Sequence, residues 1–243
     1  MNFESLRWAA IQFIVLVLCI SLHEFGHAWA ADKRRDPLPR ALGRVTLNPL
    51  AHCDKIGTFA IPALMIFLPV IFGGMPFALI GWGKPVPISL SNPKTRKADE
   101  ILITLAGPGM NLLLSLVGAL ALGIFAGIAY GRVPAETLEN SAAFGAVCSF
   151  FVMFVLMNSA LAIFNLIPLP PLDGSRVLRH AVGMSDATFV KIARNAWWIL
   201  LLAINLPPGN PIALRIFRPL VSGVAAFFLA ISEFIADFLE RLF

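Results

Sequence analysis

Five stretches of this chain are apolar over lengths that can cross a membrane, and a sixth is shorter. A backbone in hydrocarbon has no water to satisfy its N–H and C=O groups, so such stretches cross a bilayer as helices. The sequence therefore predicts an all-α polytopic membrane protein with five to six transmembrane helices. The long stretches are residues 8–31, 57–81, 101–130, 143–167 and 220–239, and the shorter one is 196–206.

The composition supports the same class. Of the 243 residues, 58% are hydrophobic and only 14% are charged, a balance that leaves no room for a sizeable soluble module. We expect one membrane-embedded domain over residues 1–243, with a core at 8–180 and a C-terminal helical pair at 191–243. The net charge of +5 comes from basic residues in short loops between spans. Such loops orient a membrane protein and do not indicate a nucleic-acid partner.

Basic residues also predict the orientation of the chain. Lys33, Arg34 and Arg35 follow the first apolar stretch at once, so the positive-inside rule puts residues 32–56 in the cytoplasm and the N-terminus outside. The second stretch, 57–81, has basic loops on both sides and contains three prolines. We predict a helical hairpin or re-entrant segment there, and a simple crossing is the alternative.

The first apolar stretch contains the sequence His23-Glu24-Phe25-Gly26-His27. Residues four apart share one face of a helix, so the two histidines can bind one metal ion with Glu24 beside them as a candidate general base. Ionisable residues within a membrane helix are costly unless they are paired or ligated. The pattern favours a catalytic zinc site about 12 Å from the cytoplasmic end of the helix. The plainer alternative is three side chains that satisfy one another at a helix interface.

A catalytic zinc takes three protein ligands and keeps another position open. The candidates for the third ligand are His52, Asp54, His180 and Asp173. Asp173 has the strongest physical case, because it follows a proline-rich elbow at the cytoplasmic end of a span. Such an elbow is stiff and can aim one carboxylate at the depth of His23 and His27. Spacing alone does not decide among the four.

Small or short polar residues recur every four positions along the stretch 101–130. They form one smooth helix face, which permits the close approach of a neighbouring helix. Asn111 lies on this face and should point into the bundle, as should Asn158 and Asn165 of a later span. The recurring residues are Gly107, Asn111, Ser115, Ala119, Gly123, Gly127 and Gly131.

Residues 81–93 are predicted to be extended, because Pro85 and Pro87 exclude a helix. Residues 43–47 are a candidate partner strand for this small β edge. The segment is either an ordered surface loop or an edge to which an unwound substrate adds a strand.

Three motifs together resemble the site-2 protease family of intramembrane zinc metalloproteases. They are His23-Glu24-Phe25-Gly26-His27, residues 106–111 (A-G-P-G-M-N), and residues 164–174, which run from F-N-L-I-P to P-L-D-G. The resemblance implies that His23, His27 and Asp173 hold one Zn²⁺ per chain and that Glu24 is the general base. It also implies that Asn165 positions the substrate or the oxyanion.

Residues 47–54 and 81–87 resemble the compact subgroup of that family, which lacks PDZ and CBS domains. Lys55 departs from this subgroup, in which proline often follows the aspartate. The roles of His52 and Asp54 therefore stay open. Together with Asn111, they are candidates for supporting the metal ligands or ordering the loop.

The resemblance implies hydrolysis of peptide bonds in or beside transmembrane segments, so the expected partners are a membrane-protein substrate and the lipid bilayer. We expect an integral protein of a prokaryotic inner membrane, with its site toward the cytoplasm. One alternative is a catalytically silent zinc-binding protein that retains or scaffolds substrates. Another is a zinc protease with glutamate as its third ligand, for which the far C-terminal pair Glu233 and Asp237 offers the one available pattern.

Overall fold

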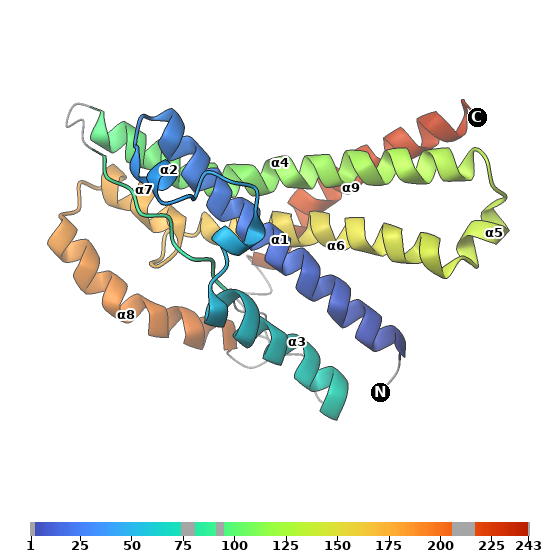
Figure 1. Cartoon of the computed structure of the whole chain (residues 1–243), viewed down its shortest axis with the longest axis horizontal. Coiled ribbons are helices and arrows are strands. Elements are labelled where there is room, and N and C mark those ends of the chain that lie inside the picture. The colour runs from blue at the N-terminus through green and yellow to red at the C-terminus, as the bar shows by residue number, and fades with distance from the viewer. Residues whose placement is uncertain (1–2, 74–80, 91–94, 206–216, 243) are drawn as a thin grey trace.

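The computed structural model describes residues 3–73, 81–90, 95–205 and 217–242. Within these ranges, five helices are long and apolar enough to cross a membrane, and there is no named sheet (Figure 1). The predicted all-α polytopic class is therefore confirmed. The five are α1 (Phe3–Lys33), α3 (Ile61–Phe72) with the π-helical turn before it (Lys55–Ala60), α4 (Arg96–Tyr130), α6 (Ala142–Asn165) and α9 (Arg218–Glu240).

Shorter elements connect these helices. They are α2 (Leu38–Ala41), a 3-10 turn (Pro49–Ala51), α5 (Ala135–Glu139), α7 (Asp173–Ala181) and α8 (Asp186–Asn205). α8 contains most of the predicted sixth stretch, but it is not among the apolar membrane-length helices of the described residues. Its first half is polar, with Lys191 and Arg194. Residues 206–216 lie outside the described part, so the pairing of α8 with α9 stays a prediction.

Local sequence signals set the ends of the long helices. Ser141 caps α6, because its hydroxyl oxygen accepts the backbone N–H of Phe144 at 3.3 Å. Pro168, which has no N–H to donate, prevents α6 from continuing. α4 begins five residues before the predicted apolar stretch, since the polar residues 96–100 are helical as well. The helix is thus longer than the apolar stretch 101–130 from which it was predicted.

α4 is the central helix and packs against α1, α6 and α9 (Figure 1). Its predicted small-residue face lies at these contacts, where Gly107, Gly123 and Gly127 are all buried. A Cβ on Gly123 would lie 2.6 Å from the carbonyl oxygen of Ser232 in α9. The smooth face therefore sets the close approach of α9, as predicted.

Residue 82 lies against the π-helical turn that precedes α3. Residues 74–80 lie outside the described part, and Trp82 then donates its backbone N–H to the carbonyl of Gly57 at 3.1 Å. The indole of Trp82 lies against Gly57, where a Cβ would overlap the ring. Thr58 donates its hydroxyl to the Trp82 carbonyl at 2.8 Å. The two ends of the unit 55–82 therefore meet.

Residues 81–90 contain no helix, as predicted from their prolines. Within the described residues, their β pairing is limited to one isolated antiparallel bridge between Cys53 and Gly83. Beside this bridge, the backbone N–H of Lys84 donates to the carbonyl of His52 at 2.8 Å. The loop after the 3-10 turn therefore holds the extended segment.

The prediction of a partner strand at residues 43–47 is wrong. These residues form turns and bends, and Gly43 has a φ of +66°, which turns the chain away from an extended path. In the described part of the chain, Arg44 instead reaches residues 84 and 85 through its side chain. Residues 91–93 of the predicted edge lie outside the described residues.

Candidate metal centre

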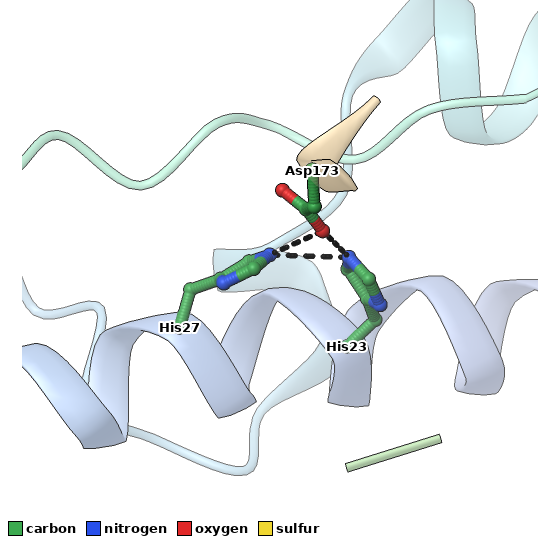
Figure 2. Close-up of side chains that lie close together, drawn as sticks. All are labelled: His23, His27 and Asp173. Carbon is green, nitrogen blue, oxygen red and sulfur yellow. Dashed lines mark hydrogen bonds and ion pairs between the residues drawn. The ribbon is translucent and has the colours of Figure 1, made fainter. Parts of the chain in front are cut away.

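His23 and His27 lie four residues apart on α1 and point to the same side of the helix (Figure 2). Their Nε2 atoms are 3.1 Å apart. The two rings are nearly perpendicular, at 87°, and only 7% of His23 is exposed. The helical period thus places both nitrogens at one point inside the bundle.

Asp173 reaches these imidazoles from α7, of which it is the first residue. Its Oδ2 atom lies 3.2 Å from the Nε2 atom of each histidine (Figure 2). Gly174 lets the elbow between α6 and α7 turn tightly, because a Cβ there would overlap the carbonyl of Leu166. The elbow therefore aims the carboxylate at α1.

Each histidine also contacts a hydrogen-bond acceptor through its other ring nitrogen. The Nδ1 atom of His27 is 2.8 Å from the carbonyl oxygen of Ile103, and that of His23 is 2.5 Å from Oδ1 of Asn111. Both acceptors require the hydrogen on Nδ1. Both Nε2 atoms are therefore left with lone pairs that face Asp173, which is the tautomer that binds a metal.

Asn111 is fully buried in α4 and is oriented by two further hydrogen bonds. Its Nδ2 atom donates to the carbonyl of Cys19 at 3.3 Å and to Oδ1 of Asn158 at 2.8 Å. Asn158 in turn donates to the carbonyl of Phe154 at 2.9 Å. These bonds assign the Asn111 nitrogen, so its oxygen faces His23. One network thus joins α1, α4 and α6 and ends on the imidazole.

The two Nε2 atoms and the Asp173 Oδ2 atom form a nearly equilateral triangle, with edges of 3.1 to 3.2 Å. Tetrahedral zinc with bonds of roughly 2.0–2.1 Å separates its ligand atoms by about 3.3 Å. The Oδ2 atom is buried and accepts no hydrogen bond from the described residues. A buried acceptor without a donor is expected where a cation binds. The three residues therefore fit one zinc ion.

Glu24 lies against the extended segment. A Cβ on Gly83 would lie 2.5 Å from Cγ of Glu24 and 2.9 Å from its Oε1 atom. Glu24 also interacts electrostatically with both histidines, with Asp173 and with Arg44. Glu24 is therefore near the three candidate ligand residues, with the backbone of Gly83 against its side chain.

Two glycines bring α4 against the imidazoles. A Cβ on Gly107 would overlap the His27 ring and lie 2.8 Å from Cε1 of His23. On α1, a Cβ on Gly26 would lie 2.7 Å from the carbonyl oxygen of Ala106. The two membrane helices can therefore approach closely at this point because Gly26 and Gly107 have no side chain.

The other candidate ligands are bonded elsewhere. Asp54 accepts two backbone N–H groups at the start of the π-helical turn, at 2.7 and 3.0 Å. The Nε2 atom of His52 is 2.8 Å from the carbonyl of Thr46, and burial lowers the pKa of this imidazole, so it is neutral at pH 7. The Nε2 atom of His180 is 3.0 Å from Oε2 of Glu100. The structure does not bring these three residues to the triangle.

Asn165 is the last residue of α6. Its amide donates to the carbonyl of Leu161, one turn earlier in the same helix, at 3.0 Å. Within the described residues, no hydrogen bond joins it to either histidine or to Asp173. Its role in positioning a substrate stays a prediction.

Two groups of the site were not predicted from the sequence. Ile103 contributes a backbone carbonyl, which any residue supplies, so no side-chain signal marks it. Arg44 is buried, although an arginine in a short loop ordinarily indicates only membrane orientation. Gly107 did carry a signal, because it lies four residues before Asn111 and therefore on the same helix face.

The site combines two histidines on an apolar helix with an adjacent glutamate and an aspartate from a second helix. This set of residues is typical of membrane metallopeptidases. Residues 11–206 match the sequence profile of Peptidase family M50. The chain therefore belongs to this family, the site-2 protease family.

Relatives in bacteria carry corresponding names. The chain is 32% identical to the protein named "Putative zinc metalloprotease YwhC" of Bacillus subtilis, over 80% of each chain. It is 28% identical to "Putative zinc metalloprotease Rip2" of Mycolicibacterium smegmatis, over 85% of this chain and 71% of the relative. The Rip2 protein of Mycobacterium tuberculosis is 26% identical over 84% and 71%. No solved structure matches the chain.

Proposed function

We propose that this protein is an intramembrane zinc metalloendopeptidase that cleaves peptide bonds in or beside transmembrane segments of membrane proteins. The observation that supports it most is the placing of the two imidazoles, the Asp173 carboxylate and Glu24 together within membrane-length helices. A structural zinc needs no adjacent base. The family and the names of the relatives support the peptidase class.

The residues divide the chemistry among them. His23, His27 and Asp173 would hold one Zn²⁺ per chain, and zinc when bound supplies Lewis acidity toward water and toward the scissile carbonyl. Glu24 accepts a proton from the attacking water and then gives it to the leaving amine. Ile103 and Asn111 keep the hydrogen of each imidazole on Nδ1, so that the ligand nitrogens stay free. Asn165 positions the substrate or the oxyanion, as the family resemblance implies.

The substrate must be locally unwound before it is cut, because a helix hides its carbonyls in i→i−4 hydrogen bonds. We propose that residues 81–90 hold the unwound strand next to Glu24. The segment is extended and its backbone lies against that carboxylate at Gly83. The meeting of residues 57 and 82 favours a re-entrant unit, which would enter and leave on the cytoplasmic side.

Orientation follows from the basic loops. We propose that the N-terminus is outside and that the metal centre faces the cytoplasmic half of a prokaryotic inner membrane. The partners are then the bilayer itself and a membrane-protein substrate. Water reaches the metal centre from the nearer, cytoplasmic side.

The test is cleavage of a quenched-fluorescent transmembrane peptide by the detergent-purified protein, beside Glu24→Gln. We expect zinc-dependent cleavage by the wild type and a loss of at least about a hundredfold in Glu24→Gln with the zinc retained. If both proteins hold zinc and neither cleaves this or any other membrane peptide, the silent zinc-binding role replaces the peptidase.

A further inference from the structure

Arg44 is buried in an unusual way for a loop arginine. Only 4% of the residue is exposed, and in the described chain no carboxylate lies within ion-pair distance of it. Arg40, four residues earlier in α2, is an ordinary surface arginine, because its side chain is 68% exposed and pairs with Asp32 at 2.7 Å. The two arginines therefore differ in role.

The guanidinium of Arg44 holds the extended segment. Its Nη1 atom donates to the carbonyl of Pro85 at 3.2 Å, and its Nη2 atom donates to the carbonyl of Lys84. The N–H of Lys84 donates to the carbonyl of His52. Both backbone polar groups of Lys84 are thus tied to the loop 44–52.

The residue held in this way adjoins the one that contacts Glu24. Gly83 precedes Lys84 directly, and it lies so close to Glu24 that a Cβ would collide with the side chain. The charge of Arg44 also attracts the Glu24 carboxylate. The far end of the segment is held separately, because Asp36 accepts the backbone N–H of Ser89 at 2.6 Å. The bridge of Gly83 to Cys53 and the bond of Lys84 to His52 hold the segment beside the carboxylate as well, and Arg44 is the charged side chain that adds to them, on the carbonyls of Lys84 and Pro85.

Folding energy does not account for this arginine. Its Nε atom is buried and has no hydrogen-bond partner in the part of the chain that the structure describes, and an unsatisfied buried donor destabilises a fold. Removing a buried charge is costly when it leaves its ion-pair partner unpaired, and Arg44 has no such partner within ion-pair distance in the described chain. Lys84 and Pro85 are exposed, so water can bond to their carbonyls when the arginine is absent.

We propose that Arg44 is a positioning residue of the peptidase: by holding the backbone of Lys84 and Pro85, it fixes Gly83 against Glu24 and so sets where the general base lies. The inference rests on the proposed function, because it names what orders the base and the segment beside it. It adds a role for a residue that binds neither the metal nor the scissile bond.

The test compares Arg44→Met, Arg44→Lys and the matched control Arg40→Met with the wild type. Three quantities are measured on each purified protein: zinc per chain, hydrogen exchange of the backbone at residues 82–90, and kcat and KM on the quenched-fluorescent transmembrane peptide. Melting temperature reports on the fold. Glu24→Gln supplies the inactive baseline.

Arg44→Met should keep its zinc and its melting temperature while exchange at residues 82–90 rises and kcat falls about 10- to 100-fold. KM should rise by a smaller factor than kcat falls, because the loosened segment still offers its backbone to the substrate but no longer fixes the general base. Arg44→Lys should recover part of kcat, since an ammonium reaches one carbonyl but lacks the fork of a guanidinium. Arg40→Met should match the wild type in every quantity.

Three results would overturn the inference. The first is Arg44→Met with wild-type kcat, and the second is unchanged exchange at residues 82–90. The third is a loss of zinc and melting temperature in step with kcat, which would make Arg44 a part of the fold alone. If the wild type cleaves no better than Glu24→Gln, the proposed peptidase fails instead, and the exchange measurement still decides whether Arg44 holds the segment.

Discussion

The two halves of α4 present the same kind of smooth face, yet they pack against different partners. In the N-terminal half, Gly107 lies against the two imidazoles. In the other half, Gly123 and Gly127 lie against the carbonyls of Ser232 and Ala236 in α9, with Cβ distances of 2.6 and 2.8 Å. One repeated feature of the sequence thus builds a metal centre at one end and a helix contact at the other.

The partners determine what each half contributes. Near the metal centre, close approach lets α4 hold the ring nitrogens through Ile103 and Asn111. Near α9, it lets two helices pack in the membrane, where dispersion and close contact drive association. Function and stability should therefore respond separately to the same glycine-to-alanine change, according to where along α4 it is made.

Gly107→Ala should have the largest effect. The new methyl group would overlap the His27 ring, so the triangle of ligand atoms must open and zinc affinity should fall by a hundredfold or more, on the order of 3 kcal/mol. Titration of the metal-free protein with zinc measures this. The control is Gly109→Ala in the same helix, where nothing lies within 4 Å of the new Cβ. If Gly107→Ala binds zinc as tightly as the wild type, the N-terminal half of α4 has no special role in the metal centre.

Asn111→Ala should lower the affinity for zinc by about 10- to 100-fold, because His23 loses the acceptor that holds its tautomer and ring orientation. Ser115→Ala is the matched control one turn along the same face. Its hydroxyl bonds to Val155 and Ser159 of α6 rather than to a histidine. Equal zinc affinity in Asn111→Ala and Ser115→Ala would show that the Asn111 amide only links helices by hydrogen bonds and does not support the metal ligand.

Gly123→Ala combined with Gly127→Ala should destabilise the protein by about 1–3 kcal/mol through overpacking against α9. Zinc per chain and kcat below the melting temperature should stay at the wild-type level. The matched control is Gly145→Ala in α6, which has open space at its Cβ. Loss of zinc in the double variant, without loss of fold, would mean that the two halves are coupled.

Pro85→Ala combined with Pro87→Ala should have the smallest effect and touches neither half of α4. The change loosens an extended segment that the prolines keep stiff, so cleavage of the transmembrane peptide should shift by a factor of about 2 to 10. The zinc content should not change. Identical cleavage rates would contradict a role for this segment in holding the substrate.

Much of the fold and the centre of the site could be predicted, because both depend on short-range patterns. The i, i+4 spacing of His23 and His27 fixes their shared face in any helix, and apolar length predicts the spans. The elbow before Asp173 predicted a directed carboxylate at a matching depth. The structure brings these three residues together.

The remaining contacts could not be predicted, because they are made by backbone or between distant segments. The partner of residues 81–90 proved to be the loop at 52–53 and the Arg44 side chain rather than a strand at 43–47. Periodicity says nothing about the Ile103 carbonyl that contacts His27. Asp54 is a carboxylate like Asp173 and could equally bind a metal by its chemistry. Only the fold shows that it caps a turn instead.

The most direct measurement is zinc per chain in the purified wild type, Asp173→Ala, His52→Ala and Asp54→Ala. We expect about one zinc in the wild type, a loss in Asp173→Ala, and retention in His52→Ala and Asp54→Ala, whose side chains bond elsewhere. If Asp173→Ala keeps its zinc while His52→Ala or Asp54→Ala loses it, the loop after α1 supplies the third ligand and the centre described here is wrong.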